Sequence, residues 1–562
     1  RHFAPHRMNV SQSASHCTVE VASGTIKGAV TQLPDGSACY CFRGIPYAVP
    51  PTTEALRFRS PVPLDRHTPN PLDCTTEREV SLASSYLPPD SVGSENCLFL
   101  NVYAPVLGES GIGGRPVMVW LHGGAFCTGS GDSSIYHPQW LVQQRVIVVT
   151  VNYRLGPAGF LCLPSVGIDG NMGLKDQRLA LRWVRRNIHV FGGQPENVTL
   201  FGESAGGVSA HLHCLSPEPL FQKIILQSGV ATSPIVFAKD AESKARRLAT
   251  FFGCKPDASD EEVLETLNSV PPDQLAKHQK EALTPYERTL DSVYAFRPTI
   301  ESASSRDPVV TEDVFTALSH PECRIHRIPM IIGVTDGEAL YKINTFRQHI
   351  DRYRQEASTR FIPDTLRVPN EERSAVAQQI VDFYCGPEGI TLQRELALSR
   401  IFTDILYLYP AVQATELHLR NQGGPLYFYT FECDTELNKF RRLWKVPEEY
   451  RGASHADDVC YLFSSSYFNT DQPIDVASKA YWLRESMCRL WTNFAKTGKP
   501  TTTTTDDGDS EIHWRPVEDP TALRFSTSTL CIGEEIAMKE QRELDARIQF
   551  WRQLYAKYNR AK

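Results

Sequence analysis

The fold is decided by the stretch Asn197-Val-Thr-Leu-Phe-Gly-Glu-Ser-Ala-Gly-Gly-Val208. Its apolar, β-branched beginning runs into Gly202-Glu-Ser-Ala-Gly206, and a helix-compatible run comes next. A strand, a sharp turn and a helix are the context that a G-x-S-x-G nucleophile elbow requires. The two glycines permit so tight a turn because they have no Cβ atom that would collide. We therefore expect Ser204 to be a nucleophile, with the N–H of Ala205 pointing to where negative charge develops.

Apolar runs on both sides of this stretch predict an α/β fold. They are nearly continuous, as in strands of a sheet covered on both faces. The expected strands are Leu98–Tyr103, Val117–Leu121, Val146–Val151, Lys223–Gln227, Pro329–Val334, Leu426–Phe431 and one near Leu523–Phe525. Helices are expected over Lys175–Asn187, Lys539–Lys557 and much of 238–291 and 345–419. Strands and helices that alternate in this way indicate one large, mostly parallel central sheet flanked by helices.

Composition sets limits on the domain organisation and the partners. No linker-like segment divides the 562 residues, so we expect a disordered N-terminal segment at 1–16 and a single domain at 17–558. The net charge of −7 argues against nucleic acid as a partner. No apolar run reaches the roughly 18 residues that a membrane span needs. The oligomeric state stays open.

The cysteines and the N-terminus favour a cytoplasmic protein. Fifteen cysteines is an odd number, and no C-x-x-C pair occurs among them. Mostly reduced, half-buried thiols are the simplest interpretation. No secretory signal is visible in the first residues. Secretion, after removal of a signal, is the alternative.

A serine nucleophile needs a base and an acid, which follow it in α/β-hydrolases in the order acid, then histidine. Two acids, Asp336 and Glu338, lie just after an expected strand, and the residues alone do not choose between them. His455 lies in the Gly-rich loop that begins at Gly452, before an apolar run. We expect His455 to accept the proton of Ser204, and the acid to fix the histidine tautomer.

An oxyanion hole is expected in the loop Trp120-Leu-His-Gly-Gly-Ala-Phe126. This loop follows a buried strand and is similar to the HGGG-type loop of esterases. The backbone N–H groups of Gly124 and Ala125, together with that of Ala205, are the expected donors to the developing oxyanion.

Several motifs in order resemble one family, the carboxylesterase/cholinesterase group of type-B esterases, which are α/β-hydrolases. The resemblance covers nearly the whole chain, and His455-Ala-Asp-Asp-Val-Cys-Tyr-Leu-Phe463 is most like insect α-esterase-type carboxylesterases. It implies that Glu338 is the triad acid and agrees with His455 as the base. The other motifs that carry it are Phe42-Arg-Gly-Ile-Pro-Tyr47, Ser94-Glu-Asn-Cys-Leu-Phe-Leu-Asn-Val102, Val151-Asn-Tyr-Arg-Leu-Gly156, Gly170-Asn-Met-Gly-Leu-Lys-Asp176 and Phe191-Gly-Gly-Gln-Pro-Glu-Asn197.

The resemblance also implies features of the substrate pocket. Ile235 falls where the family lines its acyl pocket, and a branched aliphatic residue there favours short to medium acyl groups. Cys74 and Cys97 resemble the family's first disulfide. The interval between them holds no tryptophan, and Tyr86 is its only aromatic residue. Choline esters, which cholinesterases hold by a cation–π contact with tryptophan, are therefore not the expected substrates.

These observations together predict a serine carboxylesterase with an acyl-enzyme intermediate. Its expected substrates are small aliphatic, aryl and xenobiotic esters, and its expected inhibitors are organophosphates and carbamates. No metal and no organic cofactor are implied. A juvenile-hormone-like esterase is one alternative, although hormone esterases of this family often carry Gln where this chain has Glu203. Slow sequestration of organophosphates or other toxic esters is a second alternative, and a non-catalytic adhesion protein is a third.

Overall fold

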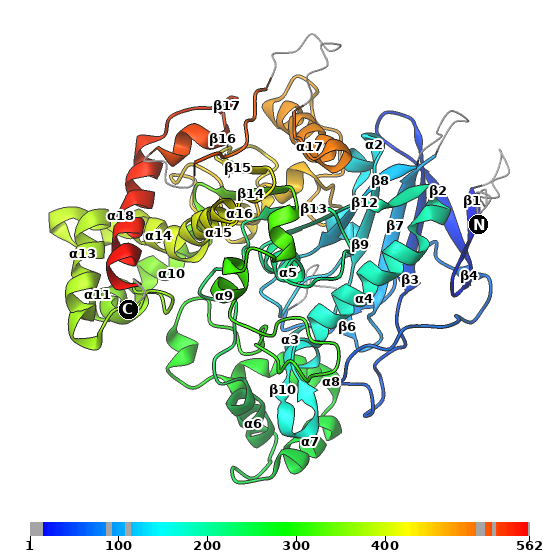
Figure 1. Cartoon of the computed structure of the whole chain (residues 1–562), viewed down its shortest axis with the longest axis horizontal. Coiled ribbons are helices and arrows are strands. Elements are labelled where there is room, and N and C mark those ends of the chain that lie inside the picture. The colour runs from blue at the N-terminus through cyan, green and yellow to red at the C-terminus, as the bar shows by residue number, and fades with distance from the viewer. Residues whose placement is uncertain (1–14, 86–92, 107–113, 502–511, 520–523, 560–562) are drawn as a thin grey trace.

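The computed structural model describes residues 15–85, 93–106, 114–501, 512–519 and 524–559. Within them, one sheet of thirteen strands runs through the molecule (Figure 1). From β9 to β16 neighbouring strands are parallel, and the strands at the two ends pair antiparallel. The order is β1 (His16–Val21), β2 (Gly24–Gln32), β3 (Ala38–Pro46), β7 (Phe99–Pro105), β9 (Ile147–Val151), β8 (Arg115–Leu121), β12 (Gly193–Glu203), β13 (Lys223–Gln227), β14 (Met330–Thr335), β15 (Leu426–Phe431), β16 (Thr529–Ile532) and β17 (Ile536–Met538), with β4 (Leu72–Asp73) beside β2. The α/β prediction is confirmed.

The sheet is buried on both faces, as the apolar runs predict. In β8, Val117 and Val119 pack into one hydrophobic cluster, whereas Met118 and Trp120 pack into a second cluster on the opposite face. Successive side chains of a strand point to opposite faces, so a strand covered on both sides has to be apolar throughout.

Helices cover the two faces (Figure 1). Apolar residues of α4 (Met172–Asn187), α5 (Ala205–His213) and α18 (Arg542–Tyr558) belong to the first cluster. Those of α2 (Gln139–Gln143) and α17 (Lys479–Thr497) belong to the second. The two segments expected to be helical also pack on the first cluster. They contain α6 (Ala241–Phe251), α7 (Asp260–Ser269), α8 (Pro272–Lys277), α10 (Ile343–Gln348), α11 (Ile350–Gln355), α12 (Ala357–Arg360), α13 (Arg373–Cys385), α14 (Glu395–Thr403) and α15 (Tyr409–Arg420).

Two boundaries differ from expectation. Strand β1 begins at His16, inside the segment expected to be disordered, and residues 1–14 lie outside the described residues. Leu523 lies outside the described residues; where a strand was expected to end, a 3₁₀ turn spans Phe525–Ser528, and β16 begins only after it. Phe525 is apolar for another reason: its ring packs edge-on against that of Phe428, with the centroids 5.0 Å apart.

The cysteines are free thiols, Cys74 and Cys97 among them, so the structure does not contain the disulfide that the resemblance implies. Both residues are buried, and burial raises the pKa of each to about 12. Among the described helices, none combines the length and the apolar composition that crossing a bilayer would take.

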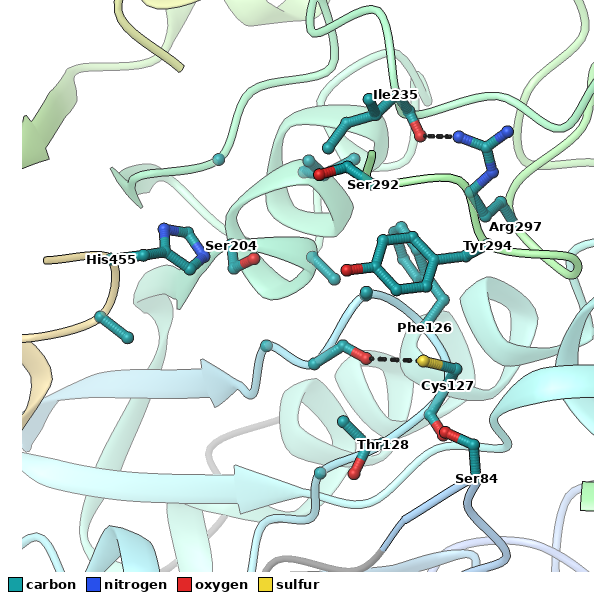
Figure 2. A pocket seen from close by; sticks show the side chains of 18 of the residues that line it. Ser84, Phe126, Cys127, Thr128, Ser204, Ile235, Ser292, Tyr294, Arg297 and His455 are labelled. Carbon is teal, nitrogen blue, oxygen red and sulfur yellow. Dashed lines mark hydrogen bonds between the residues drawn. The ribbon is translucent and has the colours of Figure 1, made fainter. Parts of the chain in front are cut away.

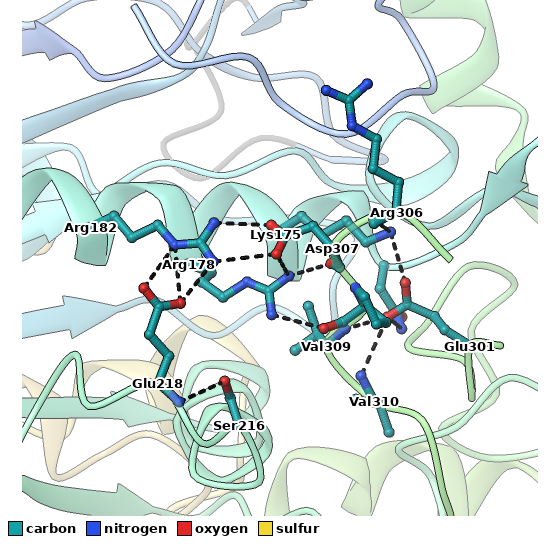
Figure 3. Close-up of polar contacts among 12 residues, drawn as sticks. Lys175, Arg178, Arg182, Ser216, Glu218, Glu301, Arg306, Asp307, Val309 and Val310 are labelled. Carbon is teal, nitrogen blue, oxygen red and sulfur yellow. Dashed lines mark hydrogen bonds and ion pairs between the residues drawn. The ribbon is translucent and has the colours of Figure 1, made fainter. Parts of the chain in front are cut away.

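A polar network ties the segment 299–310 to α4 (Figure 3). Lys175 Nζ lies 2.7 Å from Glu301 Oε1, and Glu301 Oε2 accepts a hydrogen bond from the Val309 N–H at 2.8 Å. Arg178 and Arg182 both pair with Asp307, at 2.9 and 3.0 Å. Lys175 and Glu301 are buried, so the pairing satisfies two charges that would be costly to bury alone. The segment is thereby held in one position beside the helix.

Candidate active site

Ser204 lies at a tight turn between β12, which ends at Glu203, and α5, which begins at Ala205. Its φ of 54° is in the left-handed region, where non-glycine residues are strained. A Cβ atom at Gly206 would come within 1.9 Å of the Leu121 carbonyl oxygen, so the turn requires glycine there. The local geometry is that of a nucleophile elbow.

His455 contacts Glu338, and Asp336 is directed elsewhere. His455 Nδ1 lies 2.6 Å from Glu338 Oε2, and Glu338 Oε1 accepts a hydrogen bond from the Thr335 N–H at 2.8 Å. Asp336 instead accepts a hydrogen bond from the Ala453 N–H at 2.8 Å. Two acids follow β14, only two residues apart in the sequence, and the fold brings Glu338 to the imidazole.

The other side of the imidazole faces Glu203 and Ser204. His455 Nε2 lies 3.0 Å from Glu203 Oε1, and Figure 2 shows the ring directed toward Ser204. Sequence reasoning did not give Glu203 a place in the site. Its position immediately before the nucleophile was the available signal, because a carboxylate there must lie close to the base.

Burial and charge act together on these groups. Burial raises the pKa of Glu203 to about 8. Burial alone would lower the pKa of His455, but the charge of Glu203 and the hydrogen bond to Glu338 outweigh it and raise that pKa to about 10. The imidazole therefore binds a proton more tightly than it would in water.

The loop after β8 reaches the same place. Gly124 has a φ of 110° and Ala125 a φ of 55°, so the turn suits glycine, and Ala125 adopts it with strain. The Gly124 carbonyl accepts hydrogen bonds from the N–H groups of Cys127 and Thr128, both at 3.0 Å. In the described parts of the chain, no acceptor bonds the N–H groups of Gly124, Ala125 or Ala205. These three donors are available to a ligand.

One cavity of about 760 Å³ brings these elements together (Figure 2). Its lining includes Ser204, His455 and the three residues whose N–H groups are available, and also Ile235. Tyr86 lies outside the described residues. Eight aromatic residues, to which the sequence analysis gave no role in the site, also line it. They are Phe126, Tyr136, Tyr294, Tyr341, Tyr407, Phe440, Trp444 and Tyr467. Aromatic rings therefore make up much of the cavity wall around the serine.

Comparison with known proteins gives the family. A family model described as the carboxylesterase family matches residues 15–551. Venom carboxylesterase-6 of Apis mellifera is 29% identical over 86% of this chain and 86% of its own length. Esterase B1 of Culex pipiens is 30% identical over 81% of this chain and 84% of its own length.

A solved structure supports the same assignment. The crystal structure of juvenile hormone esterase from Manduca sexta, with OTFP covalently attached, superposes with a TM-score of 0.80. It is 27% identical, and the match covers 96% of this chain and 99% of that one. The insect esterases among these relatives agree with the resemblance seen in the His455 loop. The chain belongs to the carboxylesterase family and is an enzyme of the α/β-hydrolase fold.

Proposed function

We propose that this protein is a serine carboxylesterase in which Ser204, His455 and Glu338 form the catalytic triad. The observation that carries the proposal is the pairing of His455 Nδ1 with the buried Glu338 carboxylate, 2.6 Å away, in the cavity that also contains Ser204. A carboxylate on Nδ1 fixes the tautomer and directs Nε2, which also lies 3.0 Å from Glu203 Oε1, to the side of the ring that faces the serine.

The reaction has two halves. In the first, Ser204 Oγ attacks the ester carbonyl while His455 Nε2 takes its proton, and the same proton then passes to the departing alcohol. In the second, His455 takes a proton from water, which attacks the acyl-enzyme; the proton then returns to Ser204 Oγ as the acyl–oxygen bond breaks and the acid leaves. Glu338 keeps the Nδ1 proton in place and stabilises the imidazolium in both halves.

The free backbone N–H groups supply the oxyanion hole. Those of Gly124 and Ala125 belong to the loop after β8, that of Ala205 belongs to the start of α5, and all three residues line the cavity with Ser204. Donors fixed before the substrate arrives stabilise the tetrahedral intermediate without reorganisation, and each is worth about 3 kcal/mol of the barrier. Organophosphates and carbamates present a similar electrophile to the serine, so they are the proposed inhibitors.

The substrates that suit the cavity are small aliphatic and aryl esters. Ile235 lines the acyl side by similarity to the family, and aromatic rings line much of the rest. The test is the release of p-nitrophenol from p-nitrophenyl butyrate, followed in the stopped-flow and steady-state regimes. A burst of about one equivalent per chain followed by steady turnover is expected. Absence of any enzyme-dependent release would contradict the proposal.

A juvenile-hormone-like esterase is the second candidate, because the solved structure described above is a juvenile hormone esterase that matches 96% of this chain. A panel that includes a long, uncharged methyl ester would separate the two. Markedly higher kcat/KM on that ester than on p-nitrophenyl esters would favour the hormone-type activity. A burst without later turnover would instead indicate sequestration of the ester.

A further inference from the structure

The charged side chains that line the cavity are unevenly distributed. Glu203 lies beside His455, whereas Lys280, Arg288 and Arg297 are the charged residues of the remaining wall. In Figure 2, Arg297 lies on the far side of Ser204 and Tyr294 from His455. The wall that the ester's remote end would reach is therefore cationic.

Arg297 is a buried cation that has no ion-pair partner among the described residues. Its side chain is among the buried polar residues, with 6% exposure, and it lines the cavity. One guanidinium nitrogen donates to the Ile235 carbonyl, and Nε has no hydrogen-bond partner. Among the described residues no carboxylate lies within ion-pair distance of it. Burying an unpaired charge is costly, so an anion is the expected complement.

The carboxylates closest to this wall already have cationic partners. Glu281 pairs with Arg288 at 2.7 Å, and Glu287 lies 3.6 Å from both Lys244 and Arg247. Burial lowers the pKa of Arg297 to about 10, which still leaves the side chain charged at neutral pH. The charges of Glu287 and Asp364 also reach Arg297, but each of these carboxylates lies closer to another cation, Asp364 to Lys239.

The backbone immediately after Arg297 is anchored by two hydrogen bonds. The Ala238 N–H donates to the carbonyl of Pro298 at 2.8 Å, and the Thr299 N–H donates to Asn171 Oδ1 at 2.8 Å. The following residues are bound to α4 by the network in Figure 3. A guanidinium held in this way needs little ordering when a ligand arrives, and its planar fork suits a carboxylate.

We propose that the enzyme selects esters whose acyl part ends in an anion, such as half-esters of dicarboxylic acids. The ester carbonyl lies at Ser204 and the distal carboxylate pairs with Arg297, next to the Ile235 carbonyl on the acyl side of the cavity. This inference rests on the proposed esterase function and names its substrate class. The competing explanation is that Arg297 only fastens the loop that carries Ile235.

The test compares two p-nitrophenyl esters of the same length, the hydrogen suberate and the uncharged suberamate. Wild-type kcat/KM should be higher for the anionic ester by about 10- to 100-fold, the range of one hydrogen-bonded charge pair. Arg297→Met should remove this preference, while its kcat/KM for the uncharged ester should stay within about threefold of the wild-type value. Arg297→Lys should keep part of the preference. Arg288→Gln is the matched control, since Arg288 is already paired with Glu281.

The outcomes separate the explanations. Equal wild-type rates on the two esters would overturn the proposal, and so would an equal loss on both in Arg297→Met, which is what a loop fastener gives. A second measurement needs no variant: octanoate should inhibit hydrolysis of p-nitrophenyl butyrate more strongly than octanamide, and equal inhibition would count against the anion site. Failure of the esterase assignment itself would appear differently, as no turnover of either ester.

Discussion

His455 Nε2 and Glu203 Oε1 are 3.0 Å apart, so the candidate base has a carboxylate on each side of its ring. The Glu338 carboxylate is fixed by the Thr335 N–H, whereas Glu203 Oε1 has only its contact with His455. Glu203 is therefore placed to stabilise the imidazolium that forms when Ser204 loses its proton.

Replacing Glu203 should change the pH dependence. A base works when it is unprotonated, so kcat/KM falls as the pH drops below the pKa of His455. Because the charge of Glu203 raises that pKa, Glu203→Gln should lower it and move the acidic limb to lower pH by about one unit or more. The measurement is kcat/KM for p-nitrophenyl butyrate across the limb. An unmoved limb would show that Glu203 does not act on the base.

The choice between the two acids can be tested with a pair of variants. Glu338→Gln should lower kcat by about 10⁴-fold, because the amide can hold the imidazole in the wrong tautomer. Asp336→Asn is the control: Asp336 accepts the Ala453 N–H, and an amide oxygen can still do so. Its kcat should change by less than about tenfold. The reverse result would make Asp336 the triad acid.

The loop after β8 can be tested with a second pair of variants. A Cβ atom at Gly124 would lie 2.2 Å from the Thr128 carbonyl oxygen, so Gly124→Ala should displace the donors and lower kcat by about 10²- to 10³-fold. Ala125→Gly should leave kcat near wild type and should not lower Tm, because glycine accepts the φ of 55° without strain. Loss of activity in Ala125→Gly alone would contradict the backbone-donor explanation.

The stability of the fold should depend on a buried ion pair between Arg154, which follows β9, and Asp176 of α4. Arg154 and Asp176 are both buried, with Nη2 and Oδ1 2.7 Å apart. Asp176→Asn leaves the cation unpaired and should lower the free energy of unfolding by about 3–5 kcal/mol. Asp351→Asn, which breaks the exposed pair with Arg354, should lower it by no more than about 1 kcal/mol. Urea unfolding of both variants is the measurement, and equal effects would contradict this account.

Much of the fold is readable from sequence because the relevant forces are local. The glycines around Ser204 and the continuous apolar runs report steric and burial requirements that each segment has by itself. At Phe525 the expectation of a strand was wrong, because an apolar residue can be buried in a turn as well as in a strand. Phe525 is buried by a contact with Phe428, nearly a hundred positions away, and no local pattern reports that contact.

Only part of the candidate site could be predicted from the sequence. Spacing after β14 left Asp336 and Glu338 equivalent, since which of them reaches His455 depends on how two distant loops meet. Arg297 belongs to no motif, and an arginine in a sequence gives no sign of whether a carboxylate lies beside it. The neighbours of Arg297 are determined by the packing of segments 235–238 and 281–299 with α4, which are far apart in the sequence.

Active-site labelling tests the central claim most directly. The native protein would be treated with a fluorophosphonate probe, digested and analysed by mass spectrometry, with Ser204→Ala as the control. The account predicts one adduct per chain, on Ser204, together with loss of esterase activity in proportion to labelling and no adduct in the variant. An adduct on a different residue, or full inactivation while Ser204 stays unmodified, would contradict it.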